Sequence, residues 1–309
     1  MLSMRYTLLI ALLLAGASRS QAETPAVPDD SLQAAVEAAI RGFDGIVGVY
    51  AEHLVTGQTV AIRADSLFPT ASMIKVPILV TVFDRIERGA LSYGDDLVFR
   101  DSLRYSAHDL FGDLRDGAEV PLHQAVELML SASDNTASLW LQALVGGGEA
   151  VNDWLAAHGF ERTRVNSRTP GREPHWQRYG WGQTTPREMA ELVRRIVAGE
   201  AVSPAADEEM HRLLTRTFYD DEAVSALPPS VQAATKQGAV SHSRSEVVYV
   251  HAPSGPYLFC VITKDQADHR YAPDNAGYAL IRRLSHLFWS TFEPEAVWAP
   301  AQGSEKFRL

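Results

Sequence analysis

The sequence predicts an α+β protein of three layers, α/β/α, built around one five-stranded antiparallel sheet to which both ends of the chain contribute. Three observations support this class. Strand-like runs gather near both ends, helix-like runs fill the middle, and the composition is that of a folded protein, with 46% hydrophobic and 21% charged residues in 309. We expect helices on both faces of the sheet and a mostly helical lobe inserted between its two halves.

The N-terminal part of the sheet is predicted from two neighbouring runs. β-rich residues at 46–54 and 58–63 surround the turn-like pair Thr56-Gly57 and indicate a hairpin. Before them, apolar residues at helical spacing predict a helix over 30–42. One helix and two strands should therefore come from this part of the chain.

The middle and the end of the chain complete the expected architecture. Strand-like runs return late in the chain, and an amphipathic helix follows them. The predicted helices lie at 72–86, 122–131, 136–144, 150–158, 186–198 and 275–292, and the late strands at 231–235, 246–251 and 257–263. We expect a single domain over 23–296, with an α/β lobe from about 30–70 and 220–295, a helical lobe from about 71–219 and a C-terminal tail at 297–309. The cleft between the lobes is the expected place for a site.

The N-terminus predicts export. Arg5 precedes the apolar run 8–15, and Ser20 and Ala22 supply the small residues of a signal-peptidase site. We expect residues 1–22 to be a signal peptide and the protein to be periplasmic or secreted. Since no apolar run approaches the roughly 20 residues of a membrane helix, no stable membrane anchor is expected after cleavage.

Charge and composition exclude several classes of partner. Cleavage removes Arg5 and Arg19 and no acidic residue, so the formal charge falls from −10 to −12, which would repel nucleic acid. Cys260 is the single cysteine, so an intramolecular disulfide is impossible, and its apolar run indicates a buried strand thiol. The ten histidines lack metal-binding spacings. We expect no metal and no cofactor, a monomer, and a small-molecule substrate.

The first motif with chemical meaning is Ser72-Met-Ile-Lys75, at the start of a predicted helix. Residues three apart share a helix face, so the Lys75 amine can lie beside the Ser72 hydroxyl, near the positive end of the helix dipole. A neutral lysine there can act as the base that makes the serine nucleophilic. Pro77 removes a hydrogen bond from this helix and indicates an irregular first turn.

The second motif is Ser133-Asp134-Asn135, between two helical segments. Its hydroxyl can relay a proton to a departing nitrogen, and its carboxamide can bind a substrate amide. A plain helix cap is the alternative interpretation, because Ser and Asp favour that position.

The third motif is Lys236-Gln237-Gly238, at the end of a β-rich run. The lysine offers a positive charge to a substrate carboxylate, and the glycine lets the strand approach a ligand closely. A solvated surface lysine is the alternative interpretation.

In this order the three motifs resemble the signatures of the class A β-lactamases and the related penicillin-binding proteins, Ser-x-x-Lys, Ser-Asp-Asn and Lys-Thr-Gly. The likeness extends to the stretches 133–137 and 184–190 and spans roughly 30–292. It implies a serine hydrolase that opens the β-lactam ring. Ser72 would form the acyl-enzyme, Lys75 would accept its proton, and Ser133 would pass a proton to the lactam nitrogen.

The resemblance also implies how the substrate is held. Backbone N–H groups of Ser72 and Ala239 would form the oxyanion hole. The other implied contacts are Asn135 with the substrate's side-chain amide, Lys236 and Gln237 with its carboxylate, Arg244 as a second carboxylate clamp and Tyr105 as an aromatic wall of the cleft.

The sequence departs from the family pattern in two places. Fast family members carry a loop glutamate that activates the deacylating water, and the matching stretch here is 166–176. If Pro170 is aligned with the family's proline, Thr169 stands in place of that glutamate. If the Glu-Pro pair beginning at Glu173 is aligned instead, the glutamate is present but the loop register shifts. Gln237 also replaces the Thr or Ser of the third motif.

We therefore expect acylation of Ser72 by a β-lactam, followed by modest turnover, because acylation and deacylation need different residues. Two other interpretations stay open. One is a D,D-peptidase or amidase that acts on peptidoglycan peptides, and the other is a non-catalytic penicillin-binding or sensing module that keeps the cleft. Release of D-alanine from a cell-wall peptide separates the first from a β-lactamase, and an effect that survives Ser72→Ala separates the second.

Overall fold

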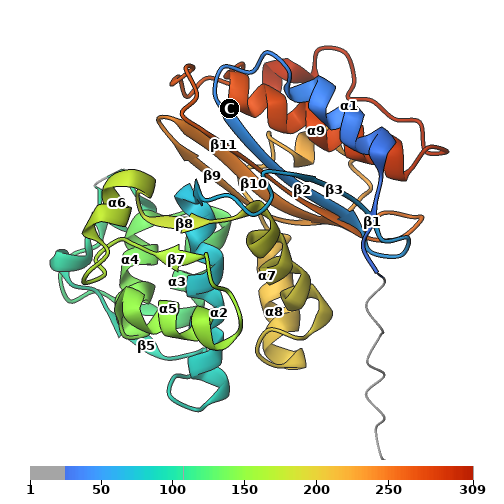
Figure 1. Ribbon diagram of the computed structural model, residues 1–309. Helices are drawn as coiled ribbons and strands as arrows, with labels where there is room; N and C mark the ends of the chain where they lie inside the picture. The colour runs from blue at the N-terminus through green and yellow to red at the C-terminus, as the bar shows by residue number, and fades with distance from the viewer. Residues whose placement is uncertain (1–24, 107, 309) are drawn as a thin grey trace, which may run out of the picture.

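The computed structural model describes residues 25–106 and 108–308. An α/β region, with a large sheet between two helical layers, lies beside a lobe of helices (Figure 1). The predicted signal peptide, residues 1–22, lies outside the described residues. In the part of the chain that is described, no helix combines the length and the apolar character that a membrane crossing requires.

The large sheet has six strands and is mixed, so the expected five-stranded antiparallel sheet is a wrong prediction in this detail. Its strands are β1 (Val27–Pro28), β3 (Gln58–Ile62), β2 (Ile46–His53), β11 (Tyr257–Lys264), β10 (Ser243–Val250) and β9 (Ala233–Val240), in that spatial order. The five longer strands are antiparallel to their neighbours, whereas β1 runs parallel to β3. A two-residue strand that ends in proline has no alternating pattern, and therefore sequence analysis missed it.

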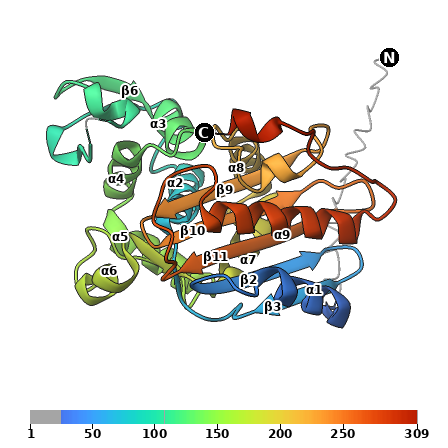
Figure 2. The same ribbon diagram turned by 90° about the horizontal axis from the view of Figure 1, so that it is seen from above.

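Helices cover both faces of this sheet. On one face α1 (Asp30–Ile40) and α9 (Ala276–Phe292) lie side by side over the strands (Figures 1 and 2). On the other face α7 (Pro186–Ala198) packs against β2, β10 and β11, and α8 (Pro204–Leu214) packs against β9. The expected helical lobe, residues 71–219, includes α7 and α8, and α8 also packs against α2 and α3.

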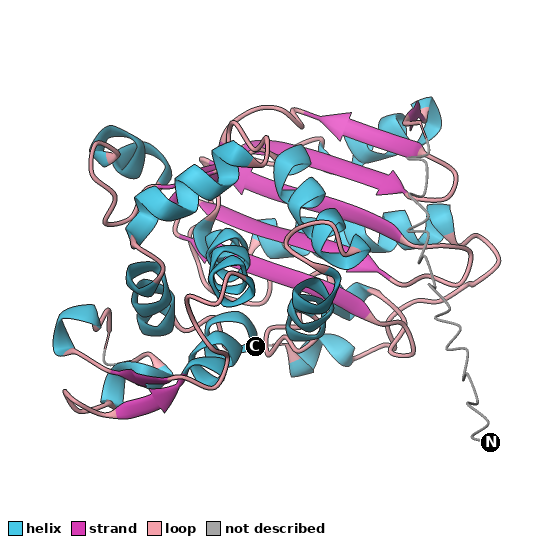
Figure 3. Ribbon diagram, turned by 90° about the horizontal axis from the view of Figure 1, so that it is seen from below, coloured by secondary structure: helices cyan, strands magenta, loops and turns pink. Residues whose placement is uncertain are grey.

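The helical lobe holds the remaining helices and two small sheets. Its helices are α2 (Lys75–Glu87), α3 (Leu122–Ser131), α4 (Asn135–Leu144), α5 (Gly147–Ala157) and α6 (Glu173–Tyr179). The small sheets are β4 (Phe68–Pro69), β8 (Gly182–Thr184) and β7 (Arg164–Val165), and β5 (Asp96–Val98) with β6 (Glu119–Pro121), the latter pair lying apart from the large sheet (Figure 3). Short 3-10 helices are η1 (Ala71–Ile74), η2 (Asp101–Leu103), η3 (Leu110–Asp113), η4 (Val224–Ala226) and η5 (Ser304–Phe307).

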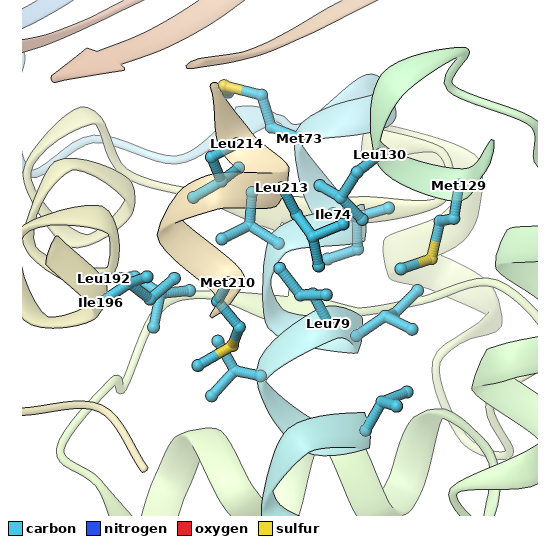
Figure 4. Close-up of a cluster of buried hydrophobic side chains, with 14 of the residues drawn as sticks. Met73, Ile74, Leu79, Met129, Leu130, Leu192, Ile196, Met210, Leu213 and Leu214 are labelled. Atoms are coloured by element: carbon cyan, nitrogen blue, oxygen red, sulfur yellow. The ribbon is translucent and has the colours of Figure 1, made fainter. Parts of the chain in front are cut away.

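A hydrophobic cluster holds the start of α2 in a fixed position. Met73 and Ile74 of η1 and Leu79 of α2 are fully buried and belong to one core with side chains of α3, α7 and α8 (Figure 4). Burial of one such side chain contributes about 1.5–3 kcal/mol. Since Ser72 lies between buried neighbours, its backbone is held from both sides.

Candidate active site

Ser72 lies in η1, and Lys75 is the first residue of α2. The irregular first turn that Pro77 indicated is this 3-10 turn. Pro77 is the third residue of α2, where a missing N–H costs no helical hydrogen bond. The geometry brings the Lys75 Nζ to 3.1 Å from the Ser72 Oγ.

Two residues at the site adopt left-handed backbone conformations that side chains disfavour. Ala71, directly before Ser72, has φ 44°, and Ser133 has φ 57°. For a residue other than glycine this region costs roughly 1–2 kcal/mol. Such strain is held only by surrounding structure and is found at functional sites. Sequence analysis did not single out Ala71, because alanine carries no signal for this conformation.

The second motif lies in the turn between α3 and α4. Asp134 caps α4, since its carboxylate accepts hydrogen bonds from the backbone N–H of Ala137 at 2.7 Å and of Phe111 at 3.0 Å. The capping interpretation thus fits the middle residue of the motif. Its neighbours, Ser133 and Asn135, face the first motif instead.

The Lys75 amine joins the two motifs. Its Nζ lies 2.5 Å from the Ser133 carbonyl oxygen, 2.8 Å from the Asn135 Oδ1 and 3.0 Å from the Ser133 Oγ. Burial and the nearby charge of Lys236 lower the pKa of Lys75 well below its usual value, against the opposing effect of Asp134. A lysine held neutral in this way can accept a proton from the Ser72 hydroxyl.

The third motif lies on the large sheet and contacts the Ser133 hydroxyl. The Lys236 Nζ on edge strand β9 donates a hydrogen bond to the Ser133 Oγ at 3.1 Å. Burial lowers the pKa of Lys236 to about 7, although the buried carboxyls of Glu222 and Glu246 act in the opposite direction. Two lysines from different lobes therefore contact one serine.

Gly238 lets β9 pass against the nucleophile turn. A Cβ on Gly238 would lie 2.7 Å from the Thr70 carbonyl oxygen and 2.9 Å from the Ser72 backbone nitrogen, closer than real Cβ atoms come. Glycine is therefore required at this crossing. Ala239, the expected partner of Ser72 in the oxyanion hole, is the next residue of the strand.

Gln237 accepts hydrogen bonds from the neighbouring Lys236. The Lys236 Nζ donates to the Gln237 carbonyl oxygen at 3.1 Å and also to the Gln237 side-chain Oε1. Both residues are buried.

Arg244 is not presented to the cleft, in contrast to the carboxylate clamp that we expected. Its guanidinium donates to the carbonyl oxygens of Val240, Ser243 and Arg270 and lies against the rings of Tyr271 and Tyr278. The residue is fully buried, with 0% of its surface exposed. A substrate carboxylate cannot reach it unless the covering residues move.

A cavity of about 580 Å³ is lined by residues of the stretch 166–181 together with Tyr105 and Leu139, and not by the residues of the three motifs themselves. Tyr105 and Trp181 line it and meet edge to face, with ring centroids 5.0 Å apart. The cavity adjoins the nucleophile turn, because Gly182, next to Trp181, accepts a hydrogen bond from the Thr70 N–H at 3.0 Å. Tyr105 is exposed, and its backbone N–H donates a hydrogen bond at 3.1 Å to the Oγ1 of Thr136, the residue after Asn135.

The two candidates for the loop glutamate position differ in their surroundings. Thr169 is buried; its hydroxyl donates to the Ser167 carbonyl oxygen at 2.9 Å and fills the space where a Gly148 side chain would be. Glu173, the first residue of α6, is exposed and lines the cavity. Of the two, only Glu173 places a carboxylate on the cavity wall.

The chain is similar over most of its length to proteins of known family. The sequence model of the Beta-lactamase enzyme family matches residues 31–292. The chain belongs to the β-lactamase enzyme family. A β-lactamase of Rhodobacter capsulatus is 27% identical to it over 264 residues, which cover 83% of this chain and 87% of that protein. A β-lactamase of Streptomyces albus G is 28% identical over 240 residues, 70% of this chain and 72% of that one.

Solved structures of similar proteins agree with this fold. PBP-A superposes with a TM-score of 0.80 at 25% identity and covers 88% of this chain and 100% of that one. A β-lactamase from Sphaerobacter thermophilus gives a TM-score of 0.75 at 26% identity and covers 85% of this chain and 98% of its own. A variant of PBP-A has been solved as an acyl-enzyme complex with penicillin G. The chain is thus an enzyme of the β-lactamase type, with an α+β fold similar to that of class A β-lactamases.

Proposed function

We propose that this β-lactamase-family enzyme opens a β-lactam ring through an acyl-enzyme on Ser72. One observation carries the proposal: the Lys75 Nζ lies 3.1 Å from the Ser72 Oγ and 3.0 Å from the Ser133 Oγ. A base, a nucleophile and a proton donor are thereby in direct contact, as acyl transfer requires.

Acylation would proceed in two steps. In the first, the Ser72 Oγ attacks the lactam carbonyl carbon and gives its proton to the neutral Lys75 amine, while N–H groups of Ser72 and Ala239 stabilise the oxyanion. Each such donor is worth about 3–4 kcal/mol. In the second, the carbon–nitrogen bond breaks, and the Ser133 hydroxyl gives its proton to the lactam nitrogen and regains one from Lys75. The ring nitrogen then carries a hydrogen, and Ser72 carries an ester.

Deacylation would be the slower step. A water must attack the Ser72 ester with the help of a base, and Glu173 is the carboxylate that lines the neighbouring cavity. Because Glu173 is exposed to solvent, we propose that it is a weak base for the attacking water and that turnover is modest.

Steady-state hydrolysis of a penicillin tests the proposal. The wild type should consume it slowly, and Ser72→Ala should lose activity to the background rate. Ser241→Ala is the matched control, since Ser241 is exposed in the turn between β9 and β10. Equal activity of wild type and Ser72→Ala would refute Ser72 as the nucleophile.

A D,D-peptidase or amidase activity on peptidoglycan peptides is the second candidate. It is favoured by the alignment of Pro170 with the family's proline, in which Thr169, with its hydroxyl turned towards α5, stands in place of the deacylating glutamate. Release of D-alanine from a peptide ending in D-Ala-D-Ala, at a rate above that of penicillin hydrolysis, would establish this activity as the main one.

We also propose that the enzyme is exported and acts on its small-molecule substrate in the periplasm or outside the cell. The proposal rests on the signal-peptide pattern of residues 1–22. N-terminal sequencing of the protein recovered from the periplasm or medium should begin at Glu23. Recovery of an uncleaved chain from the cytoplasm alone would contradict it.

A further inference from the structure

The ammonium group of Lys236 has no hydrogen free for an incoming anion. A lysine ammonium carries three N–H donors. In this structure they meet the Ser133 Oγ at 3.1 Å, the Gln237 carbonyl oxygen at 3.1 Å and the Gln237 Oε1. Of these acceptors, the Gln237 carboxamide is the one that can leave without moving the backbone or the proposed proton donor.

Arg244, a second cation near β9, is covered by other residues, although its buried Nε donates to no partner in the described part of the chain. Arg244 is fully buried, and its guanidinium already donates to three backbone carbonyl oxygens beneath the ring of Tyr271. A substrate carboxylate that arrives at the strand therefore has to displace the Gln237 side chain from Lys236. Displacement of a hydrogen bond to a charged group from a buried site is costly.

We propose that Gln237 is a specificity-determining residue whose carboxamide occupies the carboxylate position on Lys236, so that the site favours substrates with a neutral ester or amide there. The inference rests on the proposed acylation of Ser72. A neutral carbonyl gains little from Lys236 and does not need to displace the carboxamide. A substrate carboxylate does not gain a hydrogen bond from the Lys236 ammonium group, because the Gln237 carboxamide already accepts it.

Benzylpenicillin and its methyl ester test the inference, because the ester replaces the carboxylate by a neutral group and differs otherwise only by the added methyl. The quantity to measure is the ratio of the two second-order acylation rate constants, acid over ester, followed by mass spectrometry. For the wild type this ratio should lie below one, because the acid has to displace the Gln237 carboxamide and the ester does not. Gln237→Ala removes the carboxamide, and Gln237→Thr also adds a hydroxyl. Both should raise the ratio at least about tenfold.

Two comparisons keep the test decisive. Gln232→Thr, a substitution of the same type at an exposed position just before β9, should leave the ratio as in the wild type, and thermal unfolding of each variant reports whether it folds. A Gln237→Glu change should lower the ratio, because a carboxylate would then be fixed on Lys236.

The outcomes separate this inference from the function on which it rests. If the ester acylates the enzyme and the acid-over-ester ratio is the same in the wild type and in Gln237→Ala, the inference is overturned. The proposed function then still stands. A rise in Gln237→Thr without one in Gln237→Ala also overturns it, since the hydroxyl and not the vacated position would then be responsible. If neither compound acylates the wild type, the proposed function fails and the inference fails with it.

Discussion

The two walls of the cleft differ in how completely their polar groups are paired. On the acylation wall, formed by Ser72, Lys75, Ser133, Asn135 and Lys236, the lysine amines are buried and every polar partner lies within 3.1 Å. On the loop wall, residues 166–182, Asn166, Ser167 and Thr169 are also buried and hydrogen-bonded, but Glu173 and Trp176 are exposed and line a cavity. We propose that the buried, paired lysines serve acylation and that the exposed carboxylate of Glu173 serves deacylation.

The lysine amines proposed for acylation are buried and hydrogen-bonded, whereas the carboxylate proposed for deacylation is exposed. The two steps of one hydrolytic cycle therefore rest on differently ordered parts of the site. Groups that are buried and fully paired lower a barrier because they need no reorganisation at the moment of reaction. An exposed carboxylate is solvated and gives less. The predictions below test this contrast from its strongest consequence to its weakest.

Lys75→Met should have the largest effect. It removes the amine that contacts both serine hydroxyls, and loss of a general base lowers a rate by about 10²–10⁴-fold. The acylation rate constant with a penicillin should fall accordingly. Lys306→Met, an exposed change in η5, is the control and should not differ from the wild type. If the acylation rate constant of Lys75→Met is within tenfold of the wild-type value, Lys75 is not the general base and the contrast between the two walls fails.

Gly238→Ala should come next. Its methyl group would meet the Thr70 carbonyl oxygen and the Ser72 nitrogen below 3.0 Å, so β9 must move away from the nucleophile turn. We expect a loss of about 1–3 kcal/mol in the free energy of unfolding and at least tenfold slower acylation. Gly94→Ala, where a Cβ meets nothing within 4 Å, is the matched control. Unchanged stability and acylation in Gly238→Ala would show that the strand does not press on Ser72.

Glu173→Gln should act on deacylation more than on acylation. Deacylation of the penicilloyl-enzyme should slow by about tenfold, less than a base in an enclosed site contributes. Pre-steady-state measurement of the two steps separates them, and Glu149→Gln, an exposed change in the first turn of α5, serves as control. Equal slowing of both steps would place Glu173 on the acylation wall.

The buried wall should also leave a signature in the pH dependence of stability. Burial lowers the pKa of Lys236 to about 7 and raises that of Glu246 to about 7. Between pH 7 and about 10 the unfolded chain therefore binds more protons at Lys236 than the folded chain, and stability rises with pH. Between about pH 4.5 and 7 the folded chain binds more protons at Glu246, and stability falls with pH.

Melting temperatures measured from pH 4.5 to 10 check this smallest effect. Relative to the wild type, Lys236→Met should flatten the rise above pH 7, and Glu246→Gln should flatten the fall below it, each by a few degrees. Glu173→Gln, on the open wall, should leave both slopes as they are. Parallel curves for all four proteins would mean that neither buried group titrates in this way.

The sequence was sufficient for the elements with strong local patterns. The helix at 186–198 is predicted with the observed bounds, and the two long hairpins are predicted within a few residues. Three motifs far apart in the chain could be assigned to one site, because their order resembles that of a known family. The structure brings Ser72, Lys75, Ser133 and Lys236 into contact.

The features that sequence analysis missed depend on tertiary contacts. Strand β1 exists because β3 offers an edge to two residues, and the covering of Arg244 depends on a loop 26 residues further along the chain. The contact of Gln237 with Lys236 depends on the side-chain conformation of Gln237 on the edge strand β9. None of these leaves a periodic signal in the sequence.

Peptide mass spectrometry of the enzyme after brief incubation with benzylpenicillin tests the central claim most directly. The account predicts an added mass equal to one penicillin molecule on the peptide that contains Ser72, absent in Ser72→Ala and decaying slowly when free antibiotic is removed. An unmodified Ser72 peptide in protein that leaves the antibiotic intact, or an adduct on a different residue, would contradict it.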